Sequence, residues 1–342
     1  MNSSAIQKNI PLAPYTTFNI GGPADYFTVV SSEQDLCGAL EWATEQKQPV
    51  TILGGGSNVL INDSGVRGLV VKNSIGGVSH EEEGNTVYVT AGAGIVWDEL
   101  VAETVAEGLW GLENLSLIPG TVGATPVQNV GAYGVEVSNL ITKVRVYDLE
   151  KEDFSELLPN ACMFAYRDSV FKTEKGKRYI VTAVTYALSK VPNPQLEYKD
   201  LQKKFGAGKN TSSLTEIREA VISIRTGKFP DWHQKGTAGS FFHSPIISKE
   251  KYEELLSIYP GLPAFPVGDM QMKVVLSWFL DKVLHLKGVR EEKVGTYERH
   301  VLVVVNHGGA TARDVDTFAK QIEEKVLKAT GIKIKREVRM LE

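Results

Sequence analysis

The sequence predicts a mixed α/β protein with more than one domain. Residues 24–30 have the composition of a strand, a helix with one apolar stripe follows, and residues 50–53 form a buried type of strand. Strand, helix and strand at this spacing are typical of a small α/β unit. The chain has 342 residues, which at about 150 residues per domain predicts two domains or three small ones.

The first helix is expected to begin at Ser31, because Gln34 stands three residues later as in a capping box. Residues 111–134 are rich in small residues, Pro and Gly, and a non-periodic run of this length is functional or disordered. Its low charge argues against disorder. Residues 193–213 are polar and are expected to connect two domains.

The remaining elements follow from periodicity and from helix start and stop signals. Strands are predicted at 59–61, 69–71, 87–91, 144–147, 178–188, 300–306 and 332–340, helices at 97–107, 215–225, 274–284 and 311–328, and a loop at 236–245.

The composition is that of an ordinary soluble protein, with 42% hydrophobic and 23% charged residues. Lys and Arg number 37 and Asp and Glu 41, so the net charge is −4. This balance argues against a nucleic-acid binder, which normally carries a basic excess. No signal core and no run near the ~18 apolar residues of a membrane span is present, so we expect a cytoplasmic protein without membrane contact.

The two cysteines, Cys37 and Cys162, form no C-x-x-C pair, which argues against a disulfide scaffold and a cysteine zinc site. The six histidines lack the spacing of metal ligands, and His300 and His307 are interpreted as structural. The sequence therefore predicts no metal site.

Two loops of small residues are candidates for binding phosphate. In the first, backbone N–H groups can approach an anion closely because glycine has no side chain. A P-loop and a Rossmann fingerprint are both excluded, because Val59 and Leu60 stand where Lys or Gly is needed. The alternative is a tight turn between strands. The candidate residues are Gly54, Gly55, Gly56, Ser57 and Asn58.

In the second loop, the hydroxyls of Thr121 and Thr125 and several amides can hold a pyrophosphate without any Lys or Arg. An irregular loop that covers the core is the alternative. Two such loops in one chain favour a large dinucleotide bound across them. The candidate residues here are Gly120, Thr121, Gly123, Ala124, Thr125 and Gln128.

Four further positions can carry chemistry. Arg167 follows Tyr166 and can hold a carboxylate with two hydrogen bonds, although an ion pair with Asp168 is the simpler interpretation. Ser240 lies among glycines and two phenylalanines and does not match a nucleophile elbow. Arg225 and Lys228 end a helix, where cations interact with the helix dipole or with a phosphate.

Six motifs follow one another along the chain, and together they are specific although each is weak alone. They are Gly54-Gly55-Gly56-Ser57-Asn58-Val59-Leu60, Ile118-Pro119-Gly120 with Gly123 and Pro126, Gln128-Asn129 with Gly131-Ala132-Tyr133-Gly134, Tyr166-Arg167-Asp168-Ser169, Ala238-Gly239-Ser240-Phe241-Phe242 and Glu337-Val338-Arg339. The set resembles the family of UDP-N-acetylenolpyruvoylglucosamine reductases, flavoenzymes of bacterial peptidoglycan precursor synthesis. The resemblance covers nearly the whole chain, and Tyr198 resembles the closing loop of the longer subtype.

The resemblance implies an FAD-binding fold of the vanillyl-alcohol-oxidase type with two subdomains, and a third α/β domain that binds substrate. The implied ranges are 16–75 and 76–190 for the FAD-binding subdomains and 212–328 for the substrate-binding domain. Residues 329–342 are expected to form a strand that returns to the FAD-binding part.

The resemblance also implies the reaction: non-covalent FAD and the co-substrate NADPH reduce UDP-N-acetylglucosamine enolpyruvate to UDP-N-acetylmuramate. Hydride from flavin N5 adds to the carbon β to the carboxylate, Arg167 stabilises the developing charge and Ser240 protonates the α carbon. Glu337 orients that carboxylate or shares a proton with it. By the same matching, the cofactor contacts are the candidates of the two loops together with Arg225, and the substrate contacts are Tyr166, Tyr198, Lys228 and Ser244.

The sequence departs from the family pattern at two places. His243-Ser244-Pro245 stands where many relatives have Lys-Asn-Pro, and Lys335-Arg336 stands where Glu-Pro is frequent. Two alternatives remain: an oxidase with covalent flavin, although neither loop holds the His or Cys for it, and a sugar-nucleotide-binding protein without flavin. We expect a monomer, because no heptad seam or large apolar surface run is present.

Overall fold

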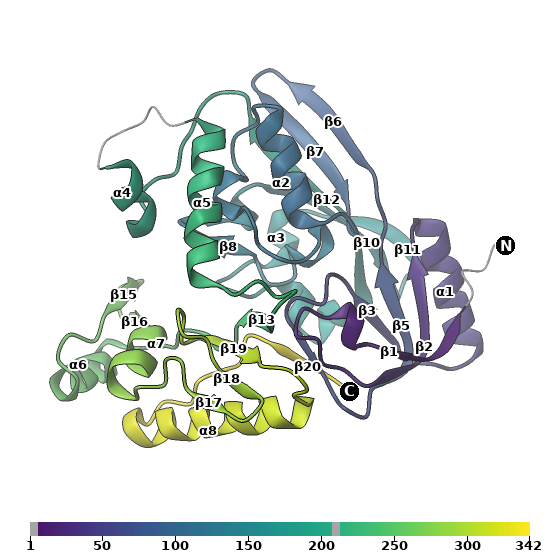
Figure 1. Cartoon of the computed structure of the whole chain (residues 1–342). Coiled ribbons are helices and arrows are strands. Elements are labelled where there is room, and N and C mark those ends of the chain that lie inside the picture. The colour runs from purple at the N-terminus through teal and green to yellow at the C-terminus, as the bar shows by residue number, and fades with distance from the viewer. Residues whose placement is uncertain (1–5, 207–212) are drawn as a thin grey trace. The chain divides into compact units, whose positions relative to one another are not determined.

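The computed structural model describes residues 6–206 and 213–342, which form two compact units (Figure 1). Neither unit is one stretch of sequence. The first comprises the described parts of Met1–Ile10, Ala24–Gly55 and Arg67–Thr226, and the second comprises Pro11–Pro23, Gly56–Val66 and Gly227–Glu342.

The first unit begins with a four-stranded sheet in the order β1-β2-β5-β3. Its strands are β1 (Gln7–Pro11), β2 (Pro23–Val30), β5 (Val66–Asn73) and β3 (Val50–Leu53). The strands β3 and β5 are parallel, with Leu53 opposite Lys72. This arrangement places the glycine turn after β3 beside the end of β5.

Helix α1 (Glu33–Glu45) follows β2 and packs its apolar stripe into a core that includes Val30, Leu69 and Tyr147. The predicted cap at Ser31 is wrong by one residue, because Ser32 accepts the hydrogen bond from the Asp35 amide. Ser31 is engaged differently, since its hydroxyl donates to the Asp35 carboxylate.

The second sheet of this unit has the order β11-β10-β12-β7-β6. Its strands are β11 (Asp153–Leu157), β10 (Ile141–Asp148), β12 (Tyr179–Ser189), β7 (Thr86–Gly92) and β6 (Val78–Glu83). Helices α2 (Trp97–Ala106) and α5 (Leu214–Lys228) share one hydrophobic core with this sheet and lie side by side in Figure 1.

The segment between β12 and α5 lies inside the first unit, which continues to Thr226, so the expectation that it connects two domains is not met by the two compact units. Within the expected connection 193–213, residues Lys199–Phe205 form helix α4, and its Leu201 is completely buried. Part of that expectation, and the predicted domain start at 212, lie outside the described residues. The short elements of this unit are 3-10 turns at Glu113–Leu115, Val122–Ala124, Val137–Asn139, Val170–Lys172 and Lys175–Arg178, strands β8 (Gly131–Ala132) and β9 (Val135–Glu136), and helix α3 (Pro159–Cys162).

The second unit is built on a four-stranded sheet in the order β13-β19-β18-β17, along which helix α8 (Ala312–Thr330) lies (Figure 1). Its strands are β13 (Gly236–Ser240), β19 (Val303–Asn306), β18 (Val294–Thr296) and β17 (Arg290–Glu291). Phe18 and Ile20 from the start of the chain complete this core.

A smaller sheet, β14-β16-β15, carries the rest of this unit. The last strand, β20, pairs in parallel with β4, so that Arg339 lies opposite Val59. The elements are β14 (Ile246–Ser248), β16 (Gln271–Val274), β15 (Ala264–Val267), α6 (Lys249–Ile258), α7 (Leu276–Trp278), a π-helical turn (Phe279–Val283), β4 (Val59–Ile61), β20 (Arg339–Leu341) and a 3-10 turn (Ala13–Tyr15).

Three predictions for this unit differ from the structure in the type of element or in its bounds. The loop expected at 236–245 begins with strand β13, because its backbone pairs with β19 although its residues are small. The helix expected at 274–284 is reduced to α7 and the π-helical turn, because β16 extends to Val274. The strand expected at 332–340 is divided, because Arg336 forms only an isolated bridge with Phe242 and β20 begins at Arg339, where β4 is its partner.

Both cysteines are free, and among the described helices none is long and apolar enough to cross a membrane. The structure therefore agrees with the expectation that no disulfide joins Cys37 to Cys162.

We expect Thr311→Ala to lower the free energy of unfolding by about 1 kcal/mol, the usual contribution of an N-cap side chain. Thr311 caps α8 in a reciprocal capping box with Asp314. Urea denaturation followed by circular dichroism measures the change. Thr311→Ser keeps the hydroxyl and should restore most of the loss, and equal losses in both variants would contradict the capping role.

Candidate active site

The glycine turn after β3 approaches the second small-residue loop with almost no space between the two backbones. A Cβ atom on Gly55 would lie 2.8 Å from the Gly120 Cα, and one on Gly54 would lie 2.8 Å from the Thr121 Oγ1. Any side chain at these positions would push the two loops apart. Only glycine therefore lets the two candidate loops meet.

The remaining residues of this turn, from Gly56 to Asn58, belong to the second unit and make contacts within it. Gly56 has a φ of +63° and its Cβ would collide with the Tyr15 carbonyl. The Asn58 side chain donates to the Glu337 carbonyl at 3.2 Å, and the Arg339 amide donates to the Asn58 carbonyl at 3.0 Å. Ser57 lies half-buried between them in the sequence. The turn that we predicted as one phosphate loop thus has two parts, one facing Gly120 and one facing the terminal segment.

Thr121 is the most informative residue of the second loop. Its hydroxyl is buried and has no hydrogen-bond partner within residues 6–206 and 213–342. A buried hydroxyl without a partner is costly, because water no longer solvates it. This hydroxyl faces Gly54 and is available to a bound ligand.

The other predicted residues of this loop are already engaged. The amides of Gly123, Ala124 and Thr125 donate to the carbonyls of Ala93, Thr121 and Val122. The Thr125 hydroxyl donates to the Val122 carbonyl and lies 2.7 Å from the Tyr186 hydroxyl. Gly120 and Thr121 are therefore the better candidates for direct contacts with a phosphate. The 3-10 turn Val122–Ala124 follows them directly.

Asp98 on α2 binds the backbone at Leu117, in the segment that precedes this loop. It accepts hydrogen bonds from the Leu117 amide at 2.5 Å and from both terminal nitrogens of Arg218 at 2.7 and 3.0 Å. Burial by itself would raise the pKa of Asp98, but the bonds from Arg218 and Leu117 outweigh it, so the pKa is lowered. Leu117 has a φ of +58°, and its carbonyl accepts from Arg225 at 3.1 Å.

This bond places Arg225 against the loop that precedes Gly120. Burial lowers the pKa of Arg225, while Tyr133 and Asp98 favour its charged form. An arginine stays protonated at neutral pH in any case. Gln128 is half-buried three residues after Thr125.

Arg167 occupies a strained position in a tight hairpin. Ala165 and Asp168 close the hairpin by two backbone hydrogen bonds, and Arg167 has a φ of +55°. Its guanidinium donates to the Gly131 carbonyl at 2.6 Å and to the Asn129 carbonyl at 3.5 Å. The Tyr166 ring lies 5.6 Å from the guanidinium carbon. Backbone carbonyls thus hold Arg167 beside the loop 128–134.

Tyr198 lies beside the same loop. Its ring packs edge-on against the Tyr133 ring at 5.3 Å and is 42% exposed. The buried Asn114 side chain donates to the Tyr133 carbonyl at 2.8 Å and to the Gln195 carbonyl at 2.7 Å. Asn114, which sequence analysis did not single out, therefore ties the loop to the segment that carries Tyr198.

In the second unit, Ser240 ends strand β13 where the pairing with β19 is irregular. The register shifts between Thr237 and Ser240, and Gly239 between them has a φ of +75°. Such a bulge redirects the following side chain. Phe241 and Phe242 are almost fully buried. They anchor the backbone on one side of Ser240, and Ser240 itself stays half-buried.

The terminal segment runs antiparallel to the residues that follow Ser240. The Glu337 amide donates to the Phe241 carbonyl at 2.8 Å, and the His243 amide donates to the Lys335 carbonyl at 2.9 Å. This pairing sets the His243 Nδ1 3.7 Å from a Glu337 carboxylate oxygen. The Glu337 side chain is only 14% exposed, although charged residues flank it in the sequence.

Arg336 explains one departure from the family pattern. Its guanidinium lies 2.6 Å from a carboxylate oxygen of Asp316 and 2.6 Å from one of Glu323, both on α8. These ion pairs fasten the segment before Glu337 to the helix. The half-buried Ser244 follows His243 and precedes β14.

Lys228 ends α5 near His300, whose pKa is lowered to about 4 by burial first and by the charge of Lys228 second. The His300 ring packs against the Phe229 ring at 5.3 Å. His300 is thus neutral at pH 7.

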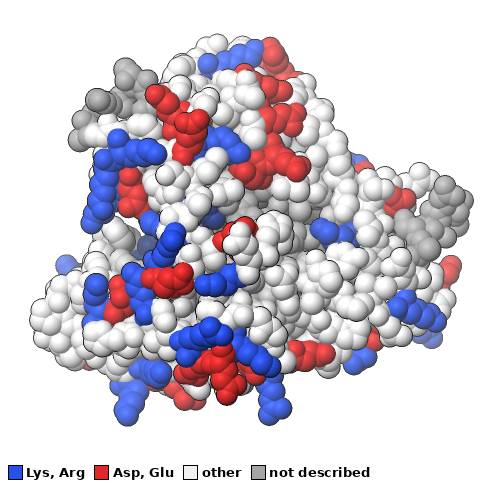
Figure 2. Space-filling model, viewed as in Figure 1, with Lys and Arg blue, Asp and Glu red and all other residues white. Residues whose placement is uncertain are grey.

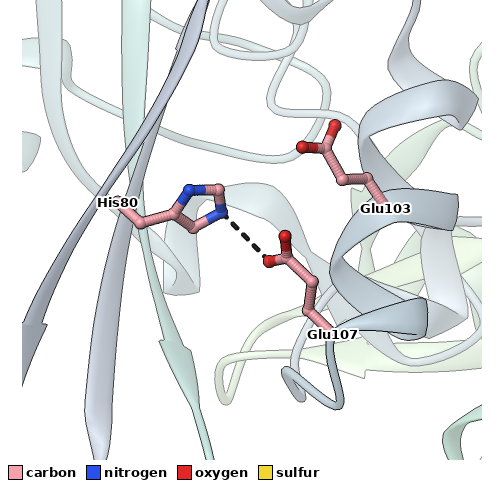
Figure 3. Close-up of side chains that lie close together, drawn as sticks. All are labelled: His80, Glu103 and Glu107. Atoms are coloured by element: carbon pink, nitrogen blue, oxygen red, sulfur yellow. Dashed lines mark ion pairs between the residues drawn. The ribbon is translucent and has the colours of Figure 1, made fainter.

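One group of possible metal ligands is present that spacing along the chain did not show. His80 on β6 and Glu103 and Glu107 at the end of α2 bring ligand atoms within 4.8 Å of one another, and His80 pairs with Glu107 at 3.1 Å (Figure 3). Acidic side chains gather around α2 on the face in Figure 2, and exposed acidic groups often cluster without an ion. We assign no metal to them.

Comparison with known proteins decides the family. Residues 24–152 match the profile of an FAD binding domain, and residues 231–341 match the C-terminal domain of UDP-N-acetylenolpyruvoylglucosamine reductase. The reductase of Chromobacterium violaceum is 39% identical over 332 residues, which are 96% of this chain and 97% of that protein. The reductase of Escherichia coli strain K12 is 38% identical over 333 residues, or 97% of this chain and 96% of that protein.

The chain belongs to the UDP-N-acetylenolpyruvoylglucosamine reductase family. The crystal structure of the reductase from Thermus caldophilus has the same fold, with a TM-score of 0.69 at 24% identity over 98% of this chain and 100% of that one. The predicted fold class, an FAD-binding fold with two subdomains and a third α/β domain, is confirmed. FAD binding also contradicts the alternative of a sugar-nucleotide protein without flavin.

The residues around the two loops fit a dinucleotide. Gly54 and Gly55 leave room for backbone to approach an anion, and the Thr121 hydroxyl lacks a partner in the described part of the chain. Sequence analysis missed Asp98, which holds Leu117, and Lys72, which donates to the Gly54 carbonyl. Lys72 directly follows the buried apolar run Leu69-Val70-Val71 of β5, and a cation at the end of such a run is the signal that could have found it.

We expect Thr121→Val to weaken FAD binding about tenfold or more, because one hydrogen bond to a charged group is lost. The stability of the apoprotein should stay unchanged, because the Thr121 hydroxyl has no partner among the described residues. Titration of apoprotein with FAD, followed by flavin fluorescence, measures the affinity. In contrast, Thr125→Val removes the bonds to Val122 and Tyr186 and should lower apoprotein stability. The opposite pattern in the two variants would contradict this assignment.

We expect Asp98→Asn to lower the free energy of unfolding at pH 7 by about 2 kcal/mol, because a charged acceptor of hydrogen bonds is lost. The lowered pKa of Asp98 means that its contribution is present above the ordinary carboxyl pKa of about 4 and is lost as the pH falls through the lower folded value. Melting temperatures between pH 7 and pH 3 should therefore converge for the two proteins. A constant difference across this range would refute the role of the charge.

Proposed function

We propose that this enzyme reduces the enolpyruvyl ether of UDP-N-acetylglucosamine enolpyruvate to UDP-N-acetylmuramate, with NADPH as the source of electrons, in peptidoglycan precursor synthesis. The observation that carries the proposal is the full-length similarity to reductases of this name, at 39% identity over 96% of the chain. FAD, when bound, would supply hydride chemistry with NADPH as the reductant. The residues of the chain bind the substrate, stabilise its charge and deliver the proton.

Arg167 is the residue that we assign to the substrate carboxylate. Hydride adds to the carbon β to this carboxylate, so negative charge develops at the α carbon and spreads into the carboxylate oxygens. A fixed guanidinium stabilises this charge more in the transition state than in the ground state. The hydrogen bonds from Arg167 to the carbonyls of Asn129 and Gly131 support this role, because they hold the group in place before substrate binds.

Ser240 is the proposed donor of the proton to the α carbon. One hydride and one proton then add across the carbon–carbon double bond. The serine recovers its proton from solvent. The bulge at Gly239 and the buried Phe241 support the role, since they fix the backbone around the hydroxyl. Glu337 is proposed to orient the carboxylate or to share a proton with it.

The remaining assignments follow from the family motifs. We propose Tyr166, Tyr198, Lys228 and Ser244 as substrate contacts, with Lys228 on the nucleotide diphosphate and Tyr198 on the closing loop. The domain ranges 16–75, 76–190, 212–328 and 329–342 also remain proposals. The cofactor contacts proposed are Gly54, Gly55, Gly56, Ser57, Asn58, Gly120, Thr121, Gly123, Ala124, Thr125, Gln128 and Arg225.

We further propose a cytoplasmic monomer whose partners are its small-molecule substrates rather than nucleic acid or membrane. The mixture of acidic and basic side chains on the face in Figure 2 supports this, since it resembles an ordinary solvated surface. Size-exclusion chromatography with light scattering tests the monomer.

We expect Ser240→Ala to slow reoxidation of the reduced flavin by the enolpyruvyl substrate by at least about a hundredfold, the usual contribution of a positioned acid. Reduction of the flavin by NADPH should stay within about twofold of the normal rate, because that step needs no proton from Ser240. Anaerobic stopped-flow absorbance separates the two half-reactions.

The control for this experiment is Ser257→Ala, which removes a hydroxyl from the surface of α6 and should change neither rate. Equal slowing of both half-reactions in Ser240→Ala would contradict the role as proton donor. A wild-type protein that is reduced by NADPH and is not reoxidised by the enolpyruvyl substrate would contradict the proposed substrate itself.

A further inference from the structure

A lysine lies beneath the glycine turn that faces Thr121. Lys72 is on β5 directly opposite Leu53, the last residue of β3, and its ammonium group donates to the Gly54 carbonyl at 2.6 Å. The same Gly54 faces the Thr121 hydroxyl, which has no partner within the described chain. One glycine is therefore in contact with a cation and with an unused hydrogen-bond donor.

The charge of Lys72 is not balanced by a carboxylate in the part of the chain that the structure describes. Among residues 6–206 and 213–342, no carboxylate lies within ion-pair distance of its ammonium group, and burial lowers its pKa. Withdrawing an ammonium ion from water is unfavourable unless an anion or a set of acceptors compensates for the lost hydration. A single carbonyl bond compensates for only part of it, so the position is suited to a ligand that brings negative charge.

We propose that Lys72 is a positioning residue for the pyrophosphate of FAD, acting through the Gly54 turn as the positive charge that balances the bound anion. The proposal rests on the placement of FAD at the two loops. It changes the expectation that the loops hold a pyrophosphate without any Lys or Arg. The amides and the Thr121 hydroxyl would supply directed hydrogen bonds, and Lys72 would supply the charge.

A purely structural role is the competing explanation. In that case the ammonium group would only tie β5 to the turn, and its loss would weaken the fold rather than the binding of an anion. The two roles differ in three measurable ways: the stability of the apoprotein, the dependence of binding on salt, and the contrast between a ligand with a pyrophosphate and one without.

The experiment compares FAD and riboflavin binding to apoprotein of the wild type, Lys72→Met and Lys72→Arg. Lys72→Met keeps the aliphatic stem and removes the charge, and we expect it to weaken FAD binding about tenfold to a hundredfold, as for a lost bond to a charged group. Lys72→Arg keeps the charge and should recover most of the affinity. Riboflavin, which lacks the pyrophosphate, should bind all three proteins alike.

Two further readouts separate charge from structure. The FAD affinity of the wild type should fall with increasing salt more steeply than that of Lys72→Met, because salt screens a charge interaction. The melting temperature of Lys72→Met apoprotein should not fall, because the variant removes an unbalanced charge. Lys143→Met is the matched control, since Lys143 is an exposed lysine of β10 in the same unit that pairs with Glu156.

The outcomes are distinct. Unchanged FAD affinity in Lys72→Met overturns the proposal, and so does an equal loss of FAD and riboflavin binding together with a lower melting temperature. A loss confined to FAD, recovered by arginine and absent from the control, supports it. If wild-type apoprotein binds FAD while Thr121→Val and Lys72→Met both leave the affinity unchanged, the placement of the pyrophosphate at these loops is wrong, although the enzyme remains an FAD protein.

Discussion

The close approach of two backbones is the constraint on which the cofactor-binding part depends. Gly55 and Gly120 are so near that a single added carbon would lie 2.8 Å from backbone, and Gly54 stands in the same relation to the Thr121 hydroxyl. The strand pair β3 and β5 delivers the first turn to this point, and the bond from the Trp97 amide to the Gly120 carbonyl at 3.0 Å holds the second. The contact brings the Thr121 hydroxyl, which has no partner in the described part of the chain, next to Gly54.

The two loops contain no charged residue, and the charged side chains that contact them or the residues just before them come from neighbouring helices and strands. Asp98 binds Arg218 and the Leu117 amide, Arg225 binds the Leu117 carbonyl, and Lys72 binds the Gly54 carbonyl. Asp98, Arg225 and Lys72 each contact a backbone amide or carbonyl, and through it they affect the conformation or the electrostatic potential of a loop. An arrangement of this kind keeps bulky side chains out of the place where the two backbones meet, while charge remains nearby.

In the second unit, backbone hydrogen bonds also position Ser240, the proposed proton donor, and Glu337, the proposed acid. The segment after Ser240 pairs with the terminal segment, so Phe241 and His243 are bonded to Glu337 and Lys335. Two buried phenylalanines and the ion pairs from Arg336 to α8 fasten both segments. The result is a rigid setting in which the Glu337 carboxylate is shielded from water and lies near the His243 ring.

Local signals in the sequence were sufficient for the strands at 24–30 and 50–53, for the long helix capped by Thr311, for the ordered motifs and hence for the family and its cofactor. These features depend on neighbouring residues and on motif chemistry. Only the tertiary structure decided that Gly236–Ser240 is a strand and that Lys72 reaches Gly54. It also decided that the Thr125 hydroxyl is engaged, while the Thr121 hydroxyl has no partner among the residues described. Each of these depends on a partner far along the chain, such as β19, Tyr186 or the turn after β3, and a partner of that kind leaves no periodic trace in the residues around it.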